Sequence, residues 1–581
     1  MSKPAIERPG VKTALLAALL VGMVLAAYGP ALRAGFIWDD DDYVTENPLL
    51  HTPDGFERIW LSMDAPSQYF PLVYTAFRIE YGLWGLDPFG YHLINVLLHA
   101  ANALLLWLLL RRLDISGAWF AAAVFALHPV HVESVAWITE RKNVMSLFFS
   151  LASLLAWLRF IELRGGSGRR FYAASLIFYA LALSSKVTAC TLPAAQLLLL
   201  WLRGYPIDRR RVAHVMPFFA LGVALGVVIT YWERHHIGTV GDRFSISFIE
   251  SFLIATRATW FYLGKLLWPA QLTFSYPKFA IDPSNPLQYS WAIAGAVLLW
   301  ILWRWRSAVG RAPLAAAIFF VASLSPLLGF IPLFTFWYTY VADHYQYMAS
   351  IGPIVLLSAG ATQLLRGRIS LGMRGLTSAA ALVLVVLAVL TWNQSRVYES
   401  EETLWRDTIA KNPTSWMAQT NLGRYLFREE RFEEAADAYG QVFAIRPDAH
   451  RAHVGRAGAL LKLGREQEAE KHFEAALELR PGLYGAHQAL ARLSWKRGER
   501  AVAIAHYEAM IAIAPGNPGG HFLMGRALQA SGRPRRALVH YRSALAIDPD
   551  HEEARKAVER IEGRRAGSSA GNPEIERASR P

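Results

Sequence analysis

Hydrophobic residues are arranged differently in the two parts of the sequence. Between residues 13 and 392, long apolar stretches alternate with short polar segments, whereas residues 399–581 have the charged composition of an ordinary soluble segment. A helix that crosses a membrane needs about 20 mostly apolar residues, because within lipid it must satisfy its own backbone. The pattern therefore predicts an all-α protein in which a polytopic membrane domain, residues 13–393, precedes a soluble domain, residues 399–563.

About eleven stretches of the first domain have the length and hydrophobicity of a membrane span. They are residues 13–31, 91–110, 117–135, 143–161, 171–185, 187–202, 212–232, 289–305, 313–331, 346–365 and 376–393. Segment 247–268 is also apolar, and we expect it to form an interfacial or re-entrant helix within a large outer loop, 233–288. The other long outer loop is 32–90.

The positive charge of the chain lies in the polar segments between these stretches. A net charge of +13 raises the possibility of nucleic-acid binding, but six short segments beside the apolar stretches hold nineteen Lys and Arg and four acidic residues. Each segment follows an even-numbered span or precedes the first, which is the positive-inside pattern of membrane proteins. We therefore expect no nucleic-acid partner, a cytoplasmic N-terminus at 1–12, and a soluble domain on the outer side. That side is the periplasm in a bacterium or the lumen of the endoplasmic reticulum in a eukaryote.

The soluble domain has a sequence period of 34 residues, which is the period of tetratricopeptide repeats. Small residues recur where two helices of a repeat approach closely, and an aromatic residue follows in each repeat. The positions in phase are Pro413, Pro447, Pro481, Pro515 and Pro549; Gly423, Ala457, Ala491 and Gly525; Ala435, Ala469, Ala503 and Ala537; and Tyr439, Phe473, Tyr507 and Tyr541.

This period predicts an α-solenoid of four repeats between about 416 and 551. A half repeat containing Trp405 precedes them, and a capping helix at about 551–563 follows. Residues 564–581 have the composition of a disordered tail. The concave face of such a solenoid is suited to binding an acceptor protein or peptide, and the alternative is a structural spacer.

Four acidic residues begin a few residues past the first span, at Asp39, Asp40, Asp41 and Asp42. At this place in the chain they lie at the level of lipid headgroups, where the phosphate of a lipid-linked sugar also lies. A carboxylate there can act as a base on an acceptor hydroxyl. The alternatives are a solvated acidic turn and a calcium-binding loop.

The second span carries a polar stripe on an otherwise apolar helix. Polar residues within a membrane usually face the interior of the helix bundle. We expect His99 and Asn102 to form hydrogen bonds between helices, and His92 and Asn95, nearer the outer end, to line the site.

Two further outer segments hold histidines and charged residues. His128, His131 and Glu133 have the side chains of a metal site, but they are not an H-E-x-x-H helix and have no obvious fourth ligand, so we expect no metal. Arg141, Lys142 and Lys186 are candidate partners of a lipid phosphate. Asp343 and His344 lie among the aromatic residues of the last outer loop.

These segments, in this order, resemble those of the TMTC-type proteins, which join a GT-C glycosyltransferase-like membrane domain to tetratricopeptide repeats. The matching stretches are residues 38–48, 91–99, 128–142 and 185–186. The resemblance implies an O-mannosyltransferase-like activity that moves a sugar from a polyprenyl-phosphate donor to Ser or Thr hydroxyls of proteins. It also implies that the acids of the first outer loop, Asp39 and Asp40, lie at the active site.

One position departs from the family. Similar proteins read Glu-Arg-Tyr in the last outer loop, where this chain has Asp343-His344-Tyr345. The hypothesis from the sequence is an inverting transfer in which Asp40 or Asp39 is the base, without a metal cofactor. The residues expected to bind the phosphate and sugar of the donor are His92, Asn95, His128, His131, Glu133, Glu140, Arg141, Lys142, Lys186, Asp343 and His344. An inactive membrane-anchored scaffold and a transporter of lipid-linked sugar are the alternatives.

Overall fold

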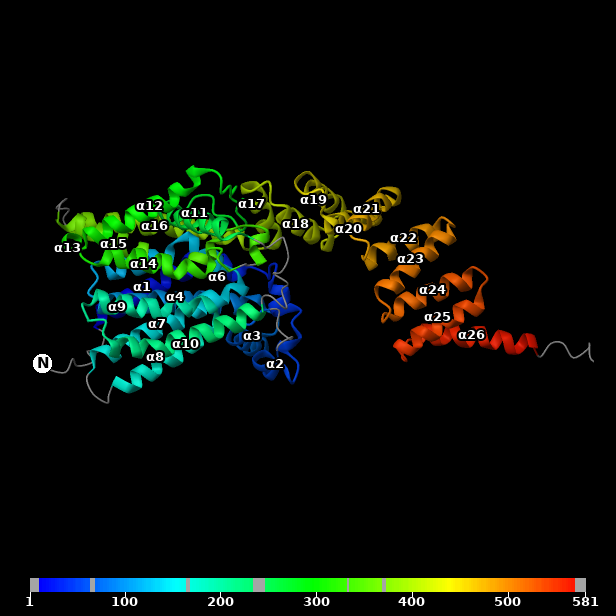
Figure 1. The fold of residues 1–581 in the computed structure, drawn as a ribbon, viewed down its shortest axis with the longest axis horizontal. Helices are drawn as coiled ribbons and strands as arrows, with labels where there is room; N and C mark the ends of the chain where they lie inside the picture. Colours follow the sequence, from blue (N-terminus) through cyan, green and yellow to red (C-terminus); the bar gives the residue numbers. More distant parts are fainter. Residues whose placement is uncertain are drawn as a thin grey trace, which may run out of the picture. The chain divides into compact units, whose positions relative to one another are not determined.

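The computed structural model describes residues 10–62, 68–163, 168–232, 246–331, 334–367 and 373–569. All regular secondary structure in these residues is helical, which confirms the predicted all-α class. The chain forms two compact units, Met1–Ser415 and Trp416–Pro581 (Figure 1). Residues outside the described ranges include most of the expected cytoplasmic N-terminus, part of the outer loop 233–288 and most of the expected tail.

The first unit is a bundle of helices. Its main helices are α1 (Val11–Ala27), α2 (Gly55–Leu61), α3 (Pro71–Trp84), α4 (Pro88–Arg112), α5 (Ala118–Leu127), α6 (Val132–Ala136), α7 (Arg141–Glu162), α8 (Arg169–Ser185), α9 (Leu192–Leu202), α10 (Arg209–Trp232), α11 (Phe248–Leu267), α12 (Ser290–Arg304), α13 (Arg306–Val309), α14 (Ala312–Leu324), α15 (Ile351–Gly367), α16 (Met373–Val397) and α17 (Glu401–Lys411).

Helix α7 lies at the centre of this bundle and packs against α4 and α8 (Figure 1). Two buried serines join α7 to α8: Ser153 Oγ donates to the carbonyl of Ser175 at 2.8 Å, and Ser175 Oγ donates to the carbonyl of Ser153 at 2.9 Å. Small polar residues of this kind let helices approach closely and hydrogen-bond within a membrane.

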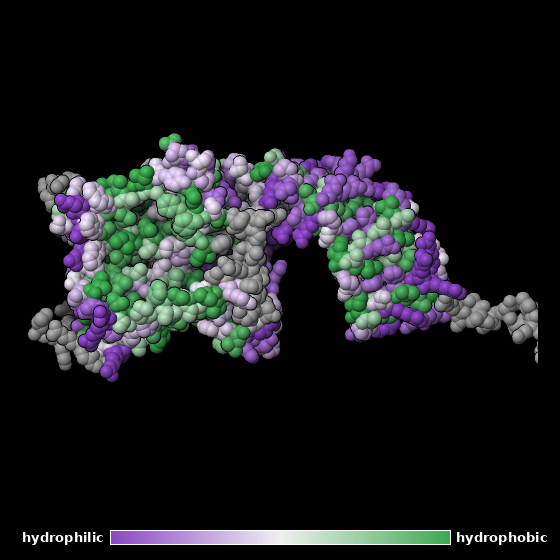
Figure 2. Space-filling view, viewed as in Figure 1, coloured by the Kyte–Doolittle hydropathy of each residue, from purple (hydrophilic) through white to green (hydrophobic). Residues whose placement is uncertain are grey.

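Several helices of this unit have the character of membrane spans. In the described residues, five helices are long and apolar enough to cross a membrane, and a bent pair at 118–136 makes a sixth if it is one span. Other expected spans are shorter helices, so the predicted number of about eleven is not confirmed. Figure 2 shows hydrophobic residues over much of the outer surface of this unit. Helices α12 and α16 expose Trp300 and Val385, among others, as helices in contact with lipid do.

The bent pair departs from the straight span expected at 117–135. Helix α5 ends at Leu127, and the chain turns by 54° before α6. Pro129 has no N–H with which to continue a helix, and the side chain of His128 accepts the N–H of Val130 instead. The break places the segment from His128 to Lys142 across one end of α4 and α7.

The second unit is a stack of helix pairs with the predicted 34-residue register. Its helices are α18 (Trp416–Arg428), α19 (Phe432–Ile445), α20 (His450–Lys462), α21 (Glu466–Leu479), α22 (Tyr484–Lys496), α23 (Arg500–Ile513), α24 (Pro518–Ala530), α25 (Pro534–Ile547) and α26 (Glu552–Ser569). A Cβ atom added at Gly525 would lie 2.7 Å from the ring of Tyr541, which explains the small residue there. The predicted small alanines of the second helices are fully buried.

The division into two units places helix α17, with Trp405 of the predicted half repeat, in the first unit. Trp405 is fully buried there with its ring 5.7 Å from that of Trp38. Helix α26 continues to Ser569, so residues 564–569 are helical, and 570–581 lie outside the described residues.

Candidate active site

The carboxylate of Asp40 is fully buried at the end of the first outer turn. Its Oδ1 accepts the backbone N–H and the hydroxyl of Thr139 at 2.9 and 2.6 Å, and its Oδ2 accepts the N–H of Ile37 at 2.9 Å. Burial raises the pKa of Asp40 to about 7, against the opposing effect of these hydrogen bonds. Asp39, the preceding residue, is only partly buried. The structure therefore brings the acidic turn against the segment that begins α7.

Trp38 reinforces the same contact. Its ring stacks on that of Trp137 with centroids 5.6 Å apart, and its backbone N–H donates to Glu401 Oε1 at 3.1 Å. The backbone of Trp38 has a φ of 45°, a value that residues other than glycine rarely adopt. The contacts of Trp38 with Trp137 and Glu401 stabilise this conformation. One turn of π-helix follows at Asp41–Thr45, a form that is frequent at functional sites.

A cluster of buried charges lies beside this turn. Glu140 Oε1 lies 2.9 Å from Lys142 Nζ, and Glu140 Oε2 lies 3.6 Å from Lys186 Nζ. Asn143 links the members, because its amide donates to Glu140 and its carbonyl accepts from Lys186 Nζ at 2.7 Å. Lys142 Nζ also lies 5.7 Å from the ring centroid of Trp137. We call Glu133, Glu140, Lys142, Asn143, Lys186 and His344 the charged cluster.

Lys186 occupies the turn between α8 and α9, with little of its side chain exposed. Burial lowers its pKa to about 8, and Glu140 opposes this shift. An ammonium group with a pKa of about 8 is still mostly charged at neutral pH, so Lys186 supplies a buried cation.

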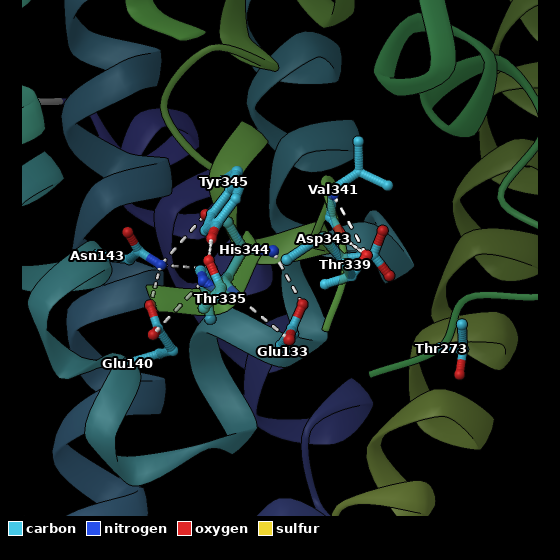
Figure 3. Close-up of polar contacts among 12 residues, drawn as sticks. Glu133, Glu140, Asn143, Thr273, Thr335, Thr339, Val341, Asp343, His344 and Tyr345 are labelled. Carbon is cyan, nitrogen blue, oxygen red and sulfur yellow. Dashed lines mark hydrogen bonds and ion pairs between the residues drawn. The ribbon is translucent and has the colours of Figure 1, made fainter. Parts of the chain in front are cut away.

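His344 lies between the two glutamates of the charged cluster (Figure 3). Its Nδ1 is 3.1 Å from Glu133 Oε1, its Nε2 is 3.8 Å from Glu140 Oε1, and its backbone N–H donates to Glu133 Oε2 at 2.9 Å. Asp343 turns away and accepts the hydroxyl of Tyr276 on both oxygens, at 3.0 and 3.1 Å. Burial, and then the charge of Glu133, raise the pKa of Asp343 well above its usual range.

Arg141 is enclosed in a different group of contacts. It forms a buried ion pair with Glu80 of α3, and it donates to Asn95 and to the carbonyl of Tyr91. Its side chain is fully buried. The guanidinium is therefore engaged in contacts within the protein, and these contacts join α3, α4 and α7.

The polar stripe on α4 is buried along its whole length. His99 Nδ1 lies 2.7 Å from the hydroxyl of Tyr347, and Asn102 donates to the carbonyl of Val144 at 2.8 Å, which confirms the expected bonds between helices. Asn95 donates to the carbonyl of Trp137 at 3.2 Å. His92 Nε2 lies 3.4 Å from the carbonyl of Gly35. Both residues therefore support the two segments that form the site.

His128 and His131 form hydrogen bonds around the break after α5. His128 Nε2 lies 3.0 Å from the carbonyl of Leu266. His131 Nδ1 lies 2.8 Å from the carbonyl of Phe125, and its Nε2 lies 2.9 Å from Ser350 Oγ. The structure thus separates these two rings from the charged cluster.

An apolar cavity of about 160 Å³ lies between α4, α7, α9, α14 and α15. It is lined almost wholly by apolar residues, including Leu151, Leu199 and Met348. A second cavity of about 10 Å³ is lined by Asn143, Ser146, Tyr347 and also Met348. Met348 lines both cavities, and the smaller one includes Asn143 of the charged cluster.

Four important partners were not singled out from the sequence. Glu80 is an isolated acid in an otherwise apolar and aromatic stretch, which was a usable signal. Thr139 and Asn143 stand inside the recognised segment 128–142 or directly after it, and their type alone gave no signal. Tyr276, the partner of Asp343, was hidden among many aromatic residues.

Comparisons with known proteins agree with this architecture. Residues 66–232 match the family described as dolichyl-phosphate-mannose-protein mannosyltransferase, and residues 387–444, 420–484 and 494–561 match tetratricopeptide repeat families. A Xenopus laevis protein named protein O-mannosyl-transferase tmtc2 is 26% identical over 524 residues, covering 73% of this chain and 61% of that protein. The resemblance to the TMTC-type proteins is confirmed.

Other relatives are also named protein O-mannosyl-transferases. Protein O-mannosyl-transferase F38B6.6 of Caenorhabditis elegans is 22% identical over 454 residues, covering 74% of this chain and 62% of that protein. TMTC2 of Mus musculus is 36% identical over 156 residues, which are 25% of this chain and 19% of that protein. The chain thus spans about three fifths of the length of the first two relatives. A crystal structure of MamA is similar over 26% of this chain and 89% of its own chain, at 18% identity and a TM-score of 0.25.

Proposed function

We propose that the chain is a membrane glycosyltransferase. It moves a mannose-like sugar from a polyprenyl-phosphate donor to Ser or Thr hydroxyls of proteins at the outer face, and its repeat unit recruits the acceptor. The names of the relatives support the class of reaction. The observation on which the proposal depends is that a partly exposed carboxylate turn lies directly against buried cations.

Two residues of the turn contact the segment that leads into α7. Trp38 stacks on Trp137, and Asp40 binds both the backbone and the side chain of Thr139. The next residue is Glu140, the anion of the charged cluster. An acceptor hydroxyl at the turn and a phosphate at the cluster are therefore neighbours, which is what direct transfer requires.

Asp39 is the proposed base, and Asp40 the residue that positions it. Both oxygens of Asp40 are occupied by hydrogen bonds and the side chain has no exposed surface, so it is poorly placed to meet a substrate. Asp39 is partly exposed on the same turn. It accepts the proton of the acceptor hydroxyl while the hydroxyl oxygen attacks the anomeric carbon and the bond to phosphate breaks, with inversion.

The leaving polyprenyl phosphate is an anion that needs cations. Lys186 Nζ is 3.6 Å from Glu140 but 2.7 Å from the neutral amide oxygen of Asn143, so its charge is incompletely paired. Lys142 is the second cation, within 2.9 Å of Glu140. In the proposal these two lysines take the charge role, and Arg141 has a structural one.

The lipid tail of the donor needs an apolar path that starts at the phosphate. The cavity between α4, α7 and α9 supplies apolar walls, and its shared residue Met348 leads toward Asn143. In the proposal the first isoprene units lie in this cavity and the remainder of the tail lies in the membrane.

The direct test is the intact mass of proteins at the outer face, from cells with the full chain and cells without it. We expect a subset of proteins to carry whole hexose units only when the chain is present. Identical masses in both samples would contradict the transferase and leave an anchored scaffold.

Lys186→Met is expected to lower kcat/KM for the lipid-linked donor about 10–100-fold, the value of one lost charge-assisted hydrogen bond. Lys186→Arg should retain most of the activity. In the wild type, kcat/KM should also fall as the pH rises through about 8, because Lys186 then loses its proton. Steady-state kinetics at varied donor concentration measure both effects, and an unchanged alkaline limb in Lys186→Arg would exclude Lys186 as the titrating cation.

Asp40→Asn is expected to remove the acidic limb of the pH profile. Below a pH of about 7 Asp40 takes up a proton, which occupies one of the acceptors that hold Ile37 and Thr139, so wild-type activity should fall as the pH decreases. Asparagine does not titrate, so the variant should be slower, by about 10-fold for a misplaced base, and flat in this range. Asp42→Asn, at an exposed position of the same turn, is the control and should keep the wild-type limb.

A further inference from the structure

Three pairs of histidines recur through the repeat unit with the same 34-residue period as the prolines. Each pair joins the first helix of a repeat to its second helix, and the partners are 19 positions apart in the sequence. The Nδ1 atoms of the partners are 3.0 Å apart in His453–His472, 2.9 Å in His487–His506 and 3.4 Å in His521–His540.

The fold of a repeat does not need such a pair. In the first repeat the corresponding positions are Gln419 and Ala438, both buried, and α18 and α19 pack as the other helix pairs do. A plain hydrogen bond between the helices would also be satisfied by many polar side chains. Imidazole at both positions of three repeats therefore calls for a property specific to imidazole.

The spacing of the nitrogens suits one metal ion. Two Zn–N bonds of about 2.0–2.1 Å at a tetrahedral angle separate the nitrogens by about 3.3–3.4 Å. At a right angle, as in square-planar Cu²⁺ or Ni²⁺ sites, the separation is about 2.8–2.9 Å. The observed distances of 2.9–3.4 Å lie across this range.

The outer side of one ring is arranged as in metal-bound histidines. His487 Nε2 lies 2.9 Å from the carbonyl of Pro481, so this nitrogen carries the proton and Nδ1 presents its lone pair to His506. A metal-bound histidine usually donates its other N–H to a carbonyl or carboxylate, which fixes the tautomer. All six rings are half-buried, so an ion reaches them from solvent.

We infer that each of the three histidine pairs is a two-ligand site for a divalent transition-metal ion of the zinc or copper class. Such a site leaves further coordination positions open to water. The inference concerns the repeat unit alone and stands whether or not the membrane unit is a transferase.

The test is the number of Zn²⁺ ions bound by the purified full chain, made without a polyhistidine tag and stripped with a chelator. Calorimetric titration with Zn²⁺ should give about three equivalents beyond any background, and each of His472→Phe, His506→Phe and His540→Phe should remove one. Phenylalanine keeps the ring volume, and an unchanged elution volume and helical circular dichroism show that the variants fold. The exposed His51→Phe is the matched control and should remove none.

A gain of binding provides a second test that does not depend on losing a side chain. The double substitution Gln419→His and Ala438→His builds the same pair in the first repeat, and the number of Zn²⁺ equivalents should rise by one. Titration with Co²⁺, followed by its visible absorption, should show imidazole ligation with the same stoichiometry. Unchanged stoichiometry in all three phenylalanine variants, or no gain in the double variant, would overturn the inference.

Discussion

Asp39→Asn is expected to lower the rate of sugar transfer by about 10²–10⁴-fold, the usual contribution of a general base. The amide keeps the size of the side chain but cannot take the proton of the acceptor hydroxyl. Because Asp39 is only partly buried, the thermal unfolding of the variant should match the wild type. Single-turnover transfer from a labelled donor measures the effect on the chemical step.

Asp42→Asn is the matched control for this substitution. It lies three residues further along the same acidic run, on the exposed side, and should transfer sugar at the wild-type rate. Full transfer by Asp39→Asn would assign the base to another residue, whereas a loss of transfer in both variants would show that the turn acts through its total charge.

Arg141→Met is expected to destabilise the first unit by about 3–5 kcal/mol, because it leaves Glu80 buried without its partner. The double variant Glu80→Met/Arg141→Met should regain most of the lost stability, since no charge then remains buried. The midpoint of thermal unfolding of the purified chain in detergent measures this order. Arg159→Met, on the same helix, removes an ion pair that is about one third exposed and should have an effect of at most about 1 kcal/mol.

This comparison also separates the two roles of Arg141. If Arg141 is a structural cation, its removal lowers the stability of the protein, and the double variant regains that stability. An Arg141→Met protein as stable as the wild type but unable to bind donor would contradict the assignment to Glu80 and return Arg141 to the phosphate.

The repeat unit was predictable because its constraints are local. A Cβ atom at residue 525 would lie 2.7 Å from the ring of Tyr541, which explains the glycine there, and a small residue, Gly or Ala, recurs at this position in each repeat. The stripe of α4 was predictable for a similar reason, since His99 and Asn102 are costly in lipid unless they meet another helix.

The site was predictable in its residue types but not in its pairings. Asp40 and Thr139 are 99 positions apart, and Arg141 and Glu80 are 61 apart. No periodicity relates such positions. The sequence therefore could not show that Lys142 and Lys186 lie near Glu140, whereas Arg141 forms an ion pair with Glu80. The break at Pro129 was overlooked because apolar residues on both sides continue the pattern of a span.

The position of a bound donor tests the central proposal most directly. A cryo-electron microscopy map of the full chain in a lipid nanodisc with a polyprenyl-phosphate sugar should show the phosphate at Lys142 and Lys186. The anomeric carbon should then lie toward Asp39, and the lipid tail along α7. Donor density elsewhere, or a sugar out of reach of Asp39, would contradict the account.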